Sequence, residues 1–184
     1  ALDARLPFPL TDGQDEVGRD IEADLAGATP MLRMLQGDVG AGKTVVALRA
    51  MLQVVDAGGQ AAFLAPTEVL AAQHARTLRT LLEPLAEAGT LTAANDATRV
   101  VLVTGSQKSK ERRVALAEAA SGAAGIVVGT HALLEDTVQF ADLGLVVVDE
   151  QHRFGVEQRD ALRSRGDRPP HTLVMTATPI PRTV

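Results

Sequence analysis

The chain has 184 residues, of which 46% are hydrophobic and 22% charged, a balance typical of one globular domain and not of a disordered chain. No apolar run approaches the ~20 residues that a membrane span needs, and the lack of cysteine excludes disulfides and cysteine-based metal sites. The net charge of -5, with four Phe and no Trp or Tyr, argues against a strongly basic face and against an aromatic platform for stacked bases.

Apolar runs rich in β-branched residues alternate with segments of helical period. Near-continuous hydrophobicity over 145–148 is typical of a strand covered on both faces, and therefore of a parallel sheet. The alternation predicts a doubly wound α/β domain, whose ligands lie beyond the carboxyl ends of the strands. Residues 86–99 have little periodicity and are predicted to be a surface loop. The predicted strands are 31–36, 61–65, 100–104, 126–129, 145–149 and 172–176, and the predicted helices are 43–56, 67–85, 110–121 and 156–163.

A glycine-rich segment follows the first predicted strand and opens a predicted helix. It matches a P-loop, in which glycines let main-chain N–H groups point into one concavity at a helix N-terminus. In that pattern Lys43 reaches the β- and γ-phosphates and the Thr44 hydroxyl binds Mg²⁺. The alternative is a turn that only ends a strand, but the strand–loop–helix context favours nucleotide binding. The residues are Gly37, Asp38, Val39, Gly40, Ala41, Gly42, Lys43 and Thr44.

Two carboxylates, Asp149 and Glu150, end the most hydrophobic predicted strand. Asp149 would hold Mg²⁺, and Glu150 would orient and deprotonate the attacking water. Two solvated acids after a strand are the alternative, but the upstream P-loop favours hydrolysis. His152 follows at the same sheet edge, where we expect it to link the γ-phosphate to the rest of a motor; as a lone histidine it would otherwise be a surface residue.

Residues 149–152 spell Asp-Glu-Gln-His, a DExH box, and with the P-loop this resembles superfamily 2 helicases. Residues 152–159 (HRFGVEQR) and 175–183 (MTATPIPRT) narrow the resemblance to RecG, a family of bacterial branch-migrating helicases. Residues 6–11 with Gln14, 65–68 and 129–133 are also similar to that family. Transcription-repair coupling factor shares the DExH-Arg-Phe-Gly and TATPIPRT signatures. Gln151 and the Thr-Gly-Ser element at 104–106 favour RecG.

This resemblance implies a RecA-like P-loop NTPase domain over residues 1–184, with a mostly parallel sheet, helices on both faces, and ATP and Mg²⁺ as cofactors. Gln14 would read the adenine edge, for which an amide has both donor and acceptor. Phe8 would either pack near the base or anchor the core. Residues 86–99 are longer than the family usually shows there and would be an insertion without bearing on the ATP site.

The resemblance also implies contacts with the DNA backbone from loops that follow predicted strands. Hydroxyls and main-chain N–H groups would make these contacts, which reconciles DNA binding with an acidic chain. Without the resemblance, these residues are predicted to be helix caps, and both roles can coexist. The DNA-contacting residues would be Pro66, Thr67, Gly105, Ser106, Thr130 and His131. A segment that couples hydrolysis to DNA movement would contain Thr176, Ala177 and Thr178, which are otherwise a strand running into a proline-rich turn.

RecG-like enzymes cleave ATP between two RecA-like lobes and recognise branched or forked DNA through a wedge domain. We expect both the second lobe and the wedge to lie outside this chain, because it opens on Ala1 without an initiator Met and stops at Val184. The implied partners are branched DNA, the second lobe of the same protein and single-stranded DNA-binding protein. A monomer in the bacterial cytoplasm, associated with the nucleoid and not with a membrane, is expected.

Two other functions remain open from the sequence. One is the motor lobe of transcription-repair coupling factor or of another superfamily 2 translocase. The other is a module that binds nucleotide without turning it over. The presence of Lys43, Thr44, Asp149 and Glu150 together argues against that module, because a degenerate site usually loses one of them.

Overall fold

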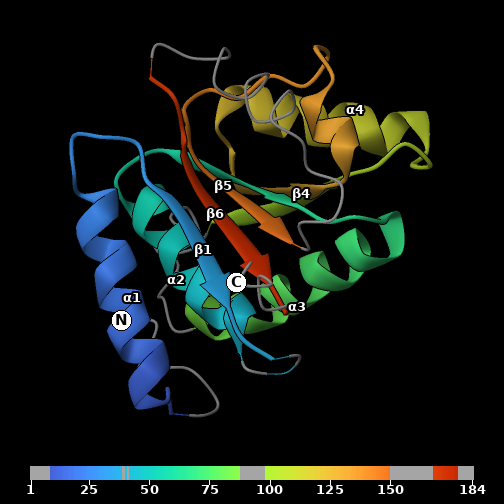
Figure 1. Ribbon diagram of the computed structural model, residues 1–184. Coiled ribbons are helices and arrows are strands. Elements are labelled where there is room, and N and C mark those ends of the chain that lie inside the picture. Colours follow the sequence, from blue (N-terminus) through green and yellow to red (C-terminus); the bar gives the residue numbers. More distant parts are fainter. Residues whose placement is uncertain (1–8, 39, 41, 88–97, 150–167, 178–184) are drawn as a thin grey trace, which may run out of the picture.

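The six apolar runs form six strands of a single sheet, in which all neighbouring strands pair in parallel (Figure 1). The computed structural model describes residues 9–38, 40, 42–87, 98–149 and 168–177. Each predicted strand is confirmed, with ends that shift by at most two residues. The order across the sheet is β1-β6-β5-β2-β4-β3. The strands are β1 (Leu32–Gln36), β2 (Gln60–Leu64), β3 (Arg99–Val103), β4 (Ala124–Gly129), β5 (Leu143–Asp149) and β6 (His171–Thr176).

Helices cover both faces of this sheet, as predicted, with α1, α2 and α3 on one side and α4 on the other (Figure 1). The predicted helix 43–56 has the same bounds as α2, whereas α3 extends to Glu87, so the loop predicted from residue 86 begins later. Residues 88–97 and the predicted helix 156–163 lie outside the described residues. The helices are α1 (Asp12–Leu25), α2 (Lys43–Asp56), α3 (Glu68–Glu87), α4 (Ser109–Ser121) and the short 3-10 helix η3 (His131–Leu134).

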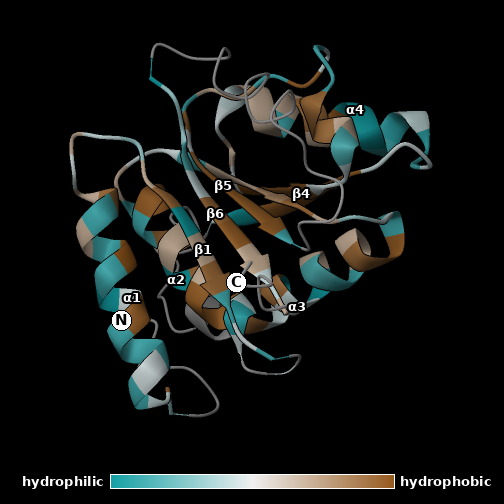
Figure 2. Cartoon of the chain, viewed as in Figure 1, coloured by the Kyte–Doolittle hydropathy of each residue, from teal (hydrophilic) through white to brown (hydrophobic). Residues whose placement is uncertain are grey.

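The sequence did not predict helix α1, which begins with a capping box. The Thr11 hydroxyl accepts from the main-chain N–H of Gln14 at 3.2 Å, and the Gln14 side-chain oxygen accepts from the main-chain N–H of Thr11 at 3.0 Å. These reciprocal bonds satisfy two donors that a helix start leaves unpaired. Only Gly18 and Ile21 are buried along this helix, in keeping with its largely hydrophilic colour in Figure 2.

Alternating strand residues build two cores, one on each face of the sheet. Phe63, Val147 and Met175 belong to the core under α1, α2 and α3, whereas Val148 and Val174 belong to the core under α4. Apolar residues accordingly gather in the strands in Figure 2. Because side chains of a strand alternate between faces, a residue two positions after Val147 projects toward α2 and α3.

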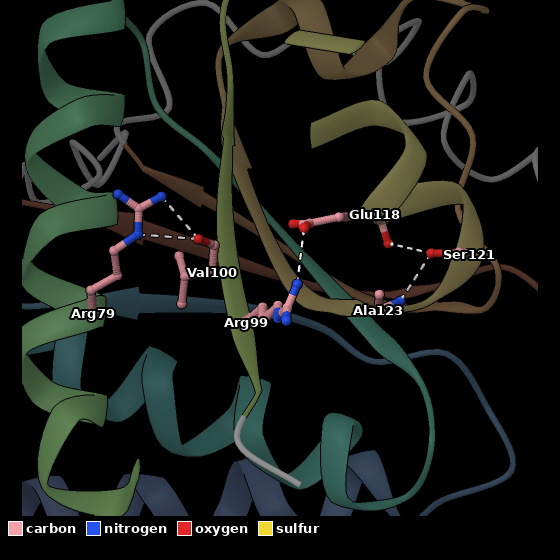
Figure 3. A network of polar contacts seen from close by, with 6 residues as sticks. All are labelled: Arg79, Arg99, Val100, Glu118, Ser121 and Ala123. Atoms are coloured by element: carbon pink, nitrogen blue, oxygen red, sulfur yellow. Dashed lines mark hydrogen bonds and ion pairs between the residues drawn. The ribbon is translucent and has the colours of Figure 1, made fainter. Parts of the chain in front are cut away.

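Polar contacts fix the two flanking helices to the β3 edge of the sheet (Figure 3). The Arg79 guanidinium on α3 donates twice to the Val100 carbonyl, at 3.1 and 2.9 Å. Arg99 pairs with Glu118 on α4 at 3.0 Å. Among the helices that the structure describes, none combines the length and apolar character that a bilayer span requires.

Candidate functional site

The carboxyl ends of the strands meet at one edge of the sheet, because all the strands run parallel. Register pairs Gln36 with Thr176, and Met175 with Asp149. The Gly37 N–H donates to the Thr176 carbonyl at 3.2 Å, which joins the start of the P-loop to the end of β6. The predicted phosphate-binding, coupling and acidic segments therefore share one edge, with β6 between the other two strands.

The P-loop turns into α2 through glycines with a left-handed backbone. Gly40 has a φ of 85° and Gly42, the N-cap of α2, a φ of 76°. Gly42 has no side chain, so the N-cap residue makes no side-chain bond to the N–H groups of the first helical turn. Such a helix start favours a bound anion. Val39 and Ala41 lie outside the described residues.

Lys43 folds back over this loop. Its Nζ donates to the Gly37 carbonyl at 2.6 Å and to the Asp38 carbonyl at 2.7 Å, and the side chain is half-buried. The ammonium is therefore held at the loop by neutral acceptors. A phosphate oxygen, which carries charge, makes a stronger hydrogen bond with an ammonium than a carbonyl does.

Gln14 reaches the same loop from α1. A Cβ added to Gly42 would lie 2.3 Å from the Gln14 Nε2, so the two residues are in close contact. The capping box that starts α1 thus also carries the Gln14 amide to the N-terminus of α2. This places Gln14 beside the phosphate-binding segment, and its contact with an adenine stays a prediction. Phe8 lies outside the described residues.

Asp149 ends β5 in a contact that the sequence did not predict. Its Oδ2 lies 2.6 Å from Nε2 of His74 on α3, and the two side chains are only 15% and 16% exposed. The His74 ring packs on Phe63, with ring centroids 4.6 Å apart. A histidine on an amphipathic helix carries no sequence signal for a contact with residue 149. Three residues predicted for catalysis and coupling, Glu150, His152 and Thr178, lie outside the described residues, whereas Thr176 and Ala177 are described.

The predicted DNA-contacting residues follow β2, β3 and β4 at the same sheet edge. The Thr67 hydroxyl accepts from the Leu70 N–H at 3.3 Å, and the Thr130 hydroxyl accepts from the Ala132 N–H at 3.4 Å. The helix-cap alternative is therefore confirmed for both threonines. Thr130 is buried, whereas the other five residues of the set are exposed: Pro66, Thr67, Gly105, Ser106 and His131.

Glu68, the first residue of α3, contacts the loop that follows β3. Its carboxylate accepts from the Ser106 hydroxyl, and from the Ser106 N–H at 3.0 Å. These two bonds lower the pKa of the Glu68 carboxyl, and the bond from the Ser106 hydroxyl has the larger effect. The Gly105 N–H and the His131 imidazole lower this pKa further, whereas burial raises it. Main-chain donors predicted to meet DNA thus bind a carboxylate of the same chain.

No group of three or more His, Asp and Glu side chains within the described parts of the chain could hold a metal ion by itself. Mg²⁺ is usually bound by one or two carboxylates together with phosphate oxygens and water. A single carboxylate, Asp149, at the sheet edge shared with a phosphate-binding loop is compatible with that ligand set.

The sequence matches the DEAD/DEAH box helicase family over residues 13–184. ATP-dependent DNA helicase RecG of Mycobacterium tuberculosis is 61% identical over 98% of this chain, and that of Bacillus subtilis 49% identical over 97%. The chain spans only 25% and 24% of these two relatives. A solved structure of RecG bound to a three-way DNA junction is 39% identical, with a TM-score of 0.79 over 98% of this chain and 22% of that one.

More distant structures share the fold. The DEAD-box helicase Mss116, solved with single-stranded RNA and UDP-BeF, has a TM-score of 0.73 and 20% identity over 97% of this chain and 38% of its own. At that identity the likeness shows a common RecA-like architecture alone.

Proposed function

The chain belongs to the DEAD/DEAH box helicase family and is a RecG-like helicase lobe, and from that premise we propose that it binds Mg-ATP at the edge formed by the P-loop and Asp149. One observation carries the proposal. The P-loop after β1 and the carboxylate that ends β5 flank β6 at one sheet edge, and Thr176 of β6 is bonded to Gly37. Phosphates and their metal need groups from both segments at once.

The described residues fit the two cofactors. The N–H groups at the start of α2 and the Lys43 ammonium would hold the β- and γ-phosphates. The Thr44 hydroxyl and the Asp149 carboxylate would hold Mg²⁺, which neutralises charge that develops on the phosphates. Lys43 would exchange the Gly37 and Asp38 carbonyls for phosphate oxygens. Glu150 would orient and deprotonate the attacking water, and His152 would link the γ-phosphate to the rest of the motor.

The whole protein would use this lobe to remodel branched DNA. The structure of RecG on a three-way DNA junction supports a branched substrate. Pro66, Thr67, Gly105, Ser106, Thr130 and His131 would contact the DNA backbone, and residues 176–178 would couple hydrolysis to movement. We also propose that a wedge domain, a second RecA-like lobe and single-stranded DNA-binding protein act with this chain in the bacterial cytoplasm. Transcription-repair coupling factor is not favoured, because the similar proteins named above are RecG.

ATP hydrolysis by a full-length protein that carries this chain tests the proposal, with forked DNA added. Lys43→Ala should abolish hydrolysis, because it removes the charge that stabilises the phosphates. Glu150→Gln should retain nucleotide binding but stop turnover. Lys110→Ala, an exposed lysine on α4, is the matched control and should hydrolyse ATP normally. Normal hydrolysis by both site variants would contradict the proposed roles.

The chain alone is expected to bind Mg-nucleotide weakly, to hydrolyse it barely and to unwind nothing. An arginine from a second lobe can contribute ~10³–10⁵-fold in rate. Robust DNA-stimulated turnover by this chain alone would show that no second lobe is required.

A further inference from the structure

The contact between His74 and Asp149 joins two elements that are 75 residues apart in sequence. His74 lies on α3 and Asp149 ends β5, and their side chains meet at 2.6 Å in a largely buried place. The imidazole also packs against the fully buried ring of Phe63, with the ring planes tilted by 43° and the centroids 4.6 Å apart. This contact with the core restrains the position of the imidazole.

A carboxylate at the end of a strand needs such a partner if it is to bind a metal in one orientation. The terminal torsion of an Asp side chain is broad, so the backbone alone does not fix the plane of its two oxygens. Carboxylates that ligate metals are themselves hydrogen-bonded, and those partners set the orientation of the ligand. With Oδ2 bonded to His74, Oδ1 is the oxygen that is available to a metal.

We propose that His74 is a positioning residue for Asp149: its Nε2–H donates to Oδ2 and so presents Oδ1 to the Mg²⁺ of the bound nucleotide. This inference rests on the proposed function, because it takes Asp149 as a metal ligand. His74 contacts neither phosphate nor water in this role. It acts through Asp149 alone.

The helix that carries His74 also reaches the predicted DNA-contacting loops. Glu68, which holds Gly105 and Ser106, lies six residues before His74, about 9 Å along the helix axis at ~1.5 Å per residue. One rigid element therefore contacts both the loop after β3 and the carboxylate that ends β5.

Calorimetric titration with ADP, once in excess MgCl₂ and once in EDTA, separates this role from a structural one. His74→Leu keeps the apolar packing but has no donor. It should lose ~10–100-fold of the affinity measured in Mg²⁺, the usual effect of losing a metal ligand's partner, and keep the affinity measured in EDTA. His74→Gln retains an amide donor and should recover part of the loss. Thr77→Ala, exposed on the same helix, should match the unmodified chain in both buffers.

Unchanged Mg-ADP affinity in His74→Leu would overturn the inference, and so would an equal loss in both buffers. Thermal unfolding of each variant shows whether it is folded. If His74→Leu is not, His74→Asn replaces it, because its amide is too short to reach Oδ2. Asp149→Asn reports separately on the proposed function. If this variant binds ADP in Mg²⁺ as tightly as the unmodified chain, Asp149 is not a metal ligand, and His74 then cannot position it for a metal.

Discussion

Replacing Gly42 by alanine should destabilise the chain for two separable reasons. An alanine at φ 76° adopts a left-handed conformation that costs about 1–2 kcal/mol. Its Cβ would also lie 2.3 Å from the Gln14 Nε2, so the Gln14 side chain must shift and the hydrogen bond that it accepts from the Thr11 N–H is lost, while the Thr11 hydroxyl can still cap the helix. An exposed hydrogen bond contributes about 0.5–1 kcal/mol, which brings the expected loss to about 1.5–3 kcal/mol. At ~2–4 °C per kcal/mol for a chain of this size, the melting temperature should fall by about 3–12 °C.

A double-mutant cycle followed by circular dichroism at 222 nm separates the two contributions. In a Gln14→Ala background the side-chain bond to the Thr11 N–H is already absent, so Gly42→Ala should cost only the backbone contribution, about 1–2 kcal/mol. Gly13→Ala is the matched control, because a Cβ there meets nothing within 4 Å. An equal loss from Gly42→Ala in both backgrounds would refute the contact between the P-loop and Gln14.

Three further predictions concern residues outside the P-loop. Because the Ser106 hydroxyl most strongly lowers the pKa of Glu68, Ser106→Ala should return the pKa of that carboxyl toward its ordinary 4.5 in an NMR titration, and an unchanged pKa would contradict this. The contact stabilises the chain above pH ~4.5 and loses its effect as the pH falls through the lowered pKa. Burial lowers the pKa of His171 below 6.5, and its Nδ1 accepts from the Met31 N–H at 2.8 Å, so the free energy of unfolding should fall as the pH drops below about 6.5. Urea unfolding at pH 7.5 and 5.5 should show a smaller loss of stability in His171→Asn than in the unmodified chain, and equal losses would contradict this role. Gln60→Leu removes buried hydrogen bonds to Ala119, Ala124, Ala141 and Asp142 and should lower the free energy of unfolding in urea by at least about 3 kcal/mol. The control Gln53→Leu loses one exposed bond to Glu22 and should cost less than about 1 kcal/mol, and similar losses in the two variants would disprove this.

Local sequence signals predict the strands and the P-loop well, because each depends on neighbouring residues. The run 145–148 is hydrophobic throughout since β5 is covered on both faces, and α2 begins where the glycines end. Helix α1 buries only Gly18 and Ile21 and has no long apolar run, and the signal that marks its start is the pair Thr11 and Gln14 at capping-box spacing.

Contacts between distant segments could not be predicted in this way. His74 meets Asp149 across 75 residues, and Glu68 meets Ser106 across 38. Each pair exists only because the strand order places α3 beside the ends of β5 and β3. The sequence therefore predicts the residue types at the sheet edge but not the two side chains on α3 that hold them.

Titration of the purified chain with Mg-ADP by calorimetry tests most directly whether this is a nucleotide-binding lobe. The protein concentration must come from peptide absorbance, because the chain has no Trp or Tyr. We predict saturable binding at one site that is lost in Lys43→Ala and retained in Lys110→Ala. A chain that binds no Mg-ADP, or one that binds it equally well after Lys43→Ala, would contradict a phosphate site at the start of α2.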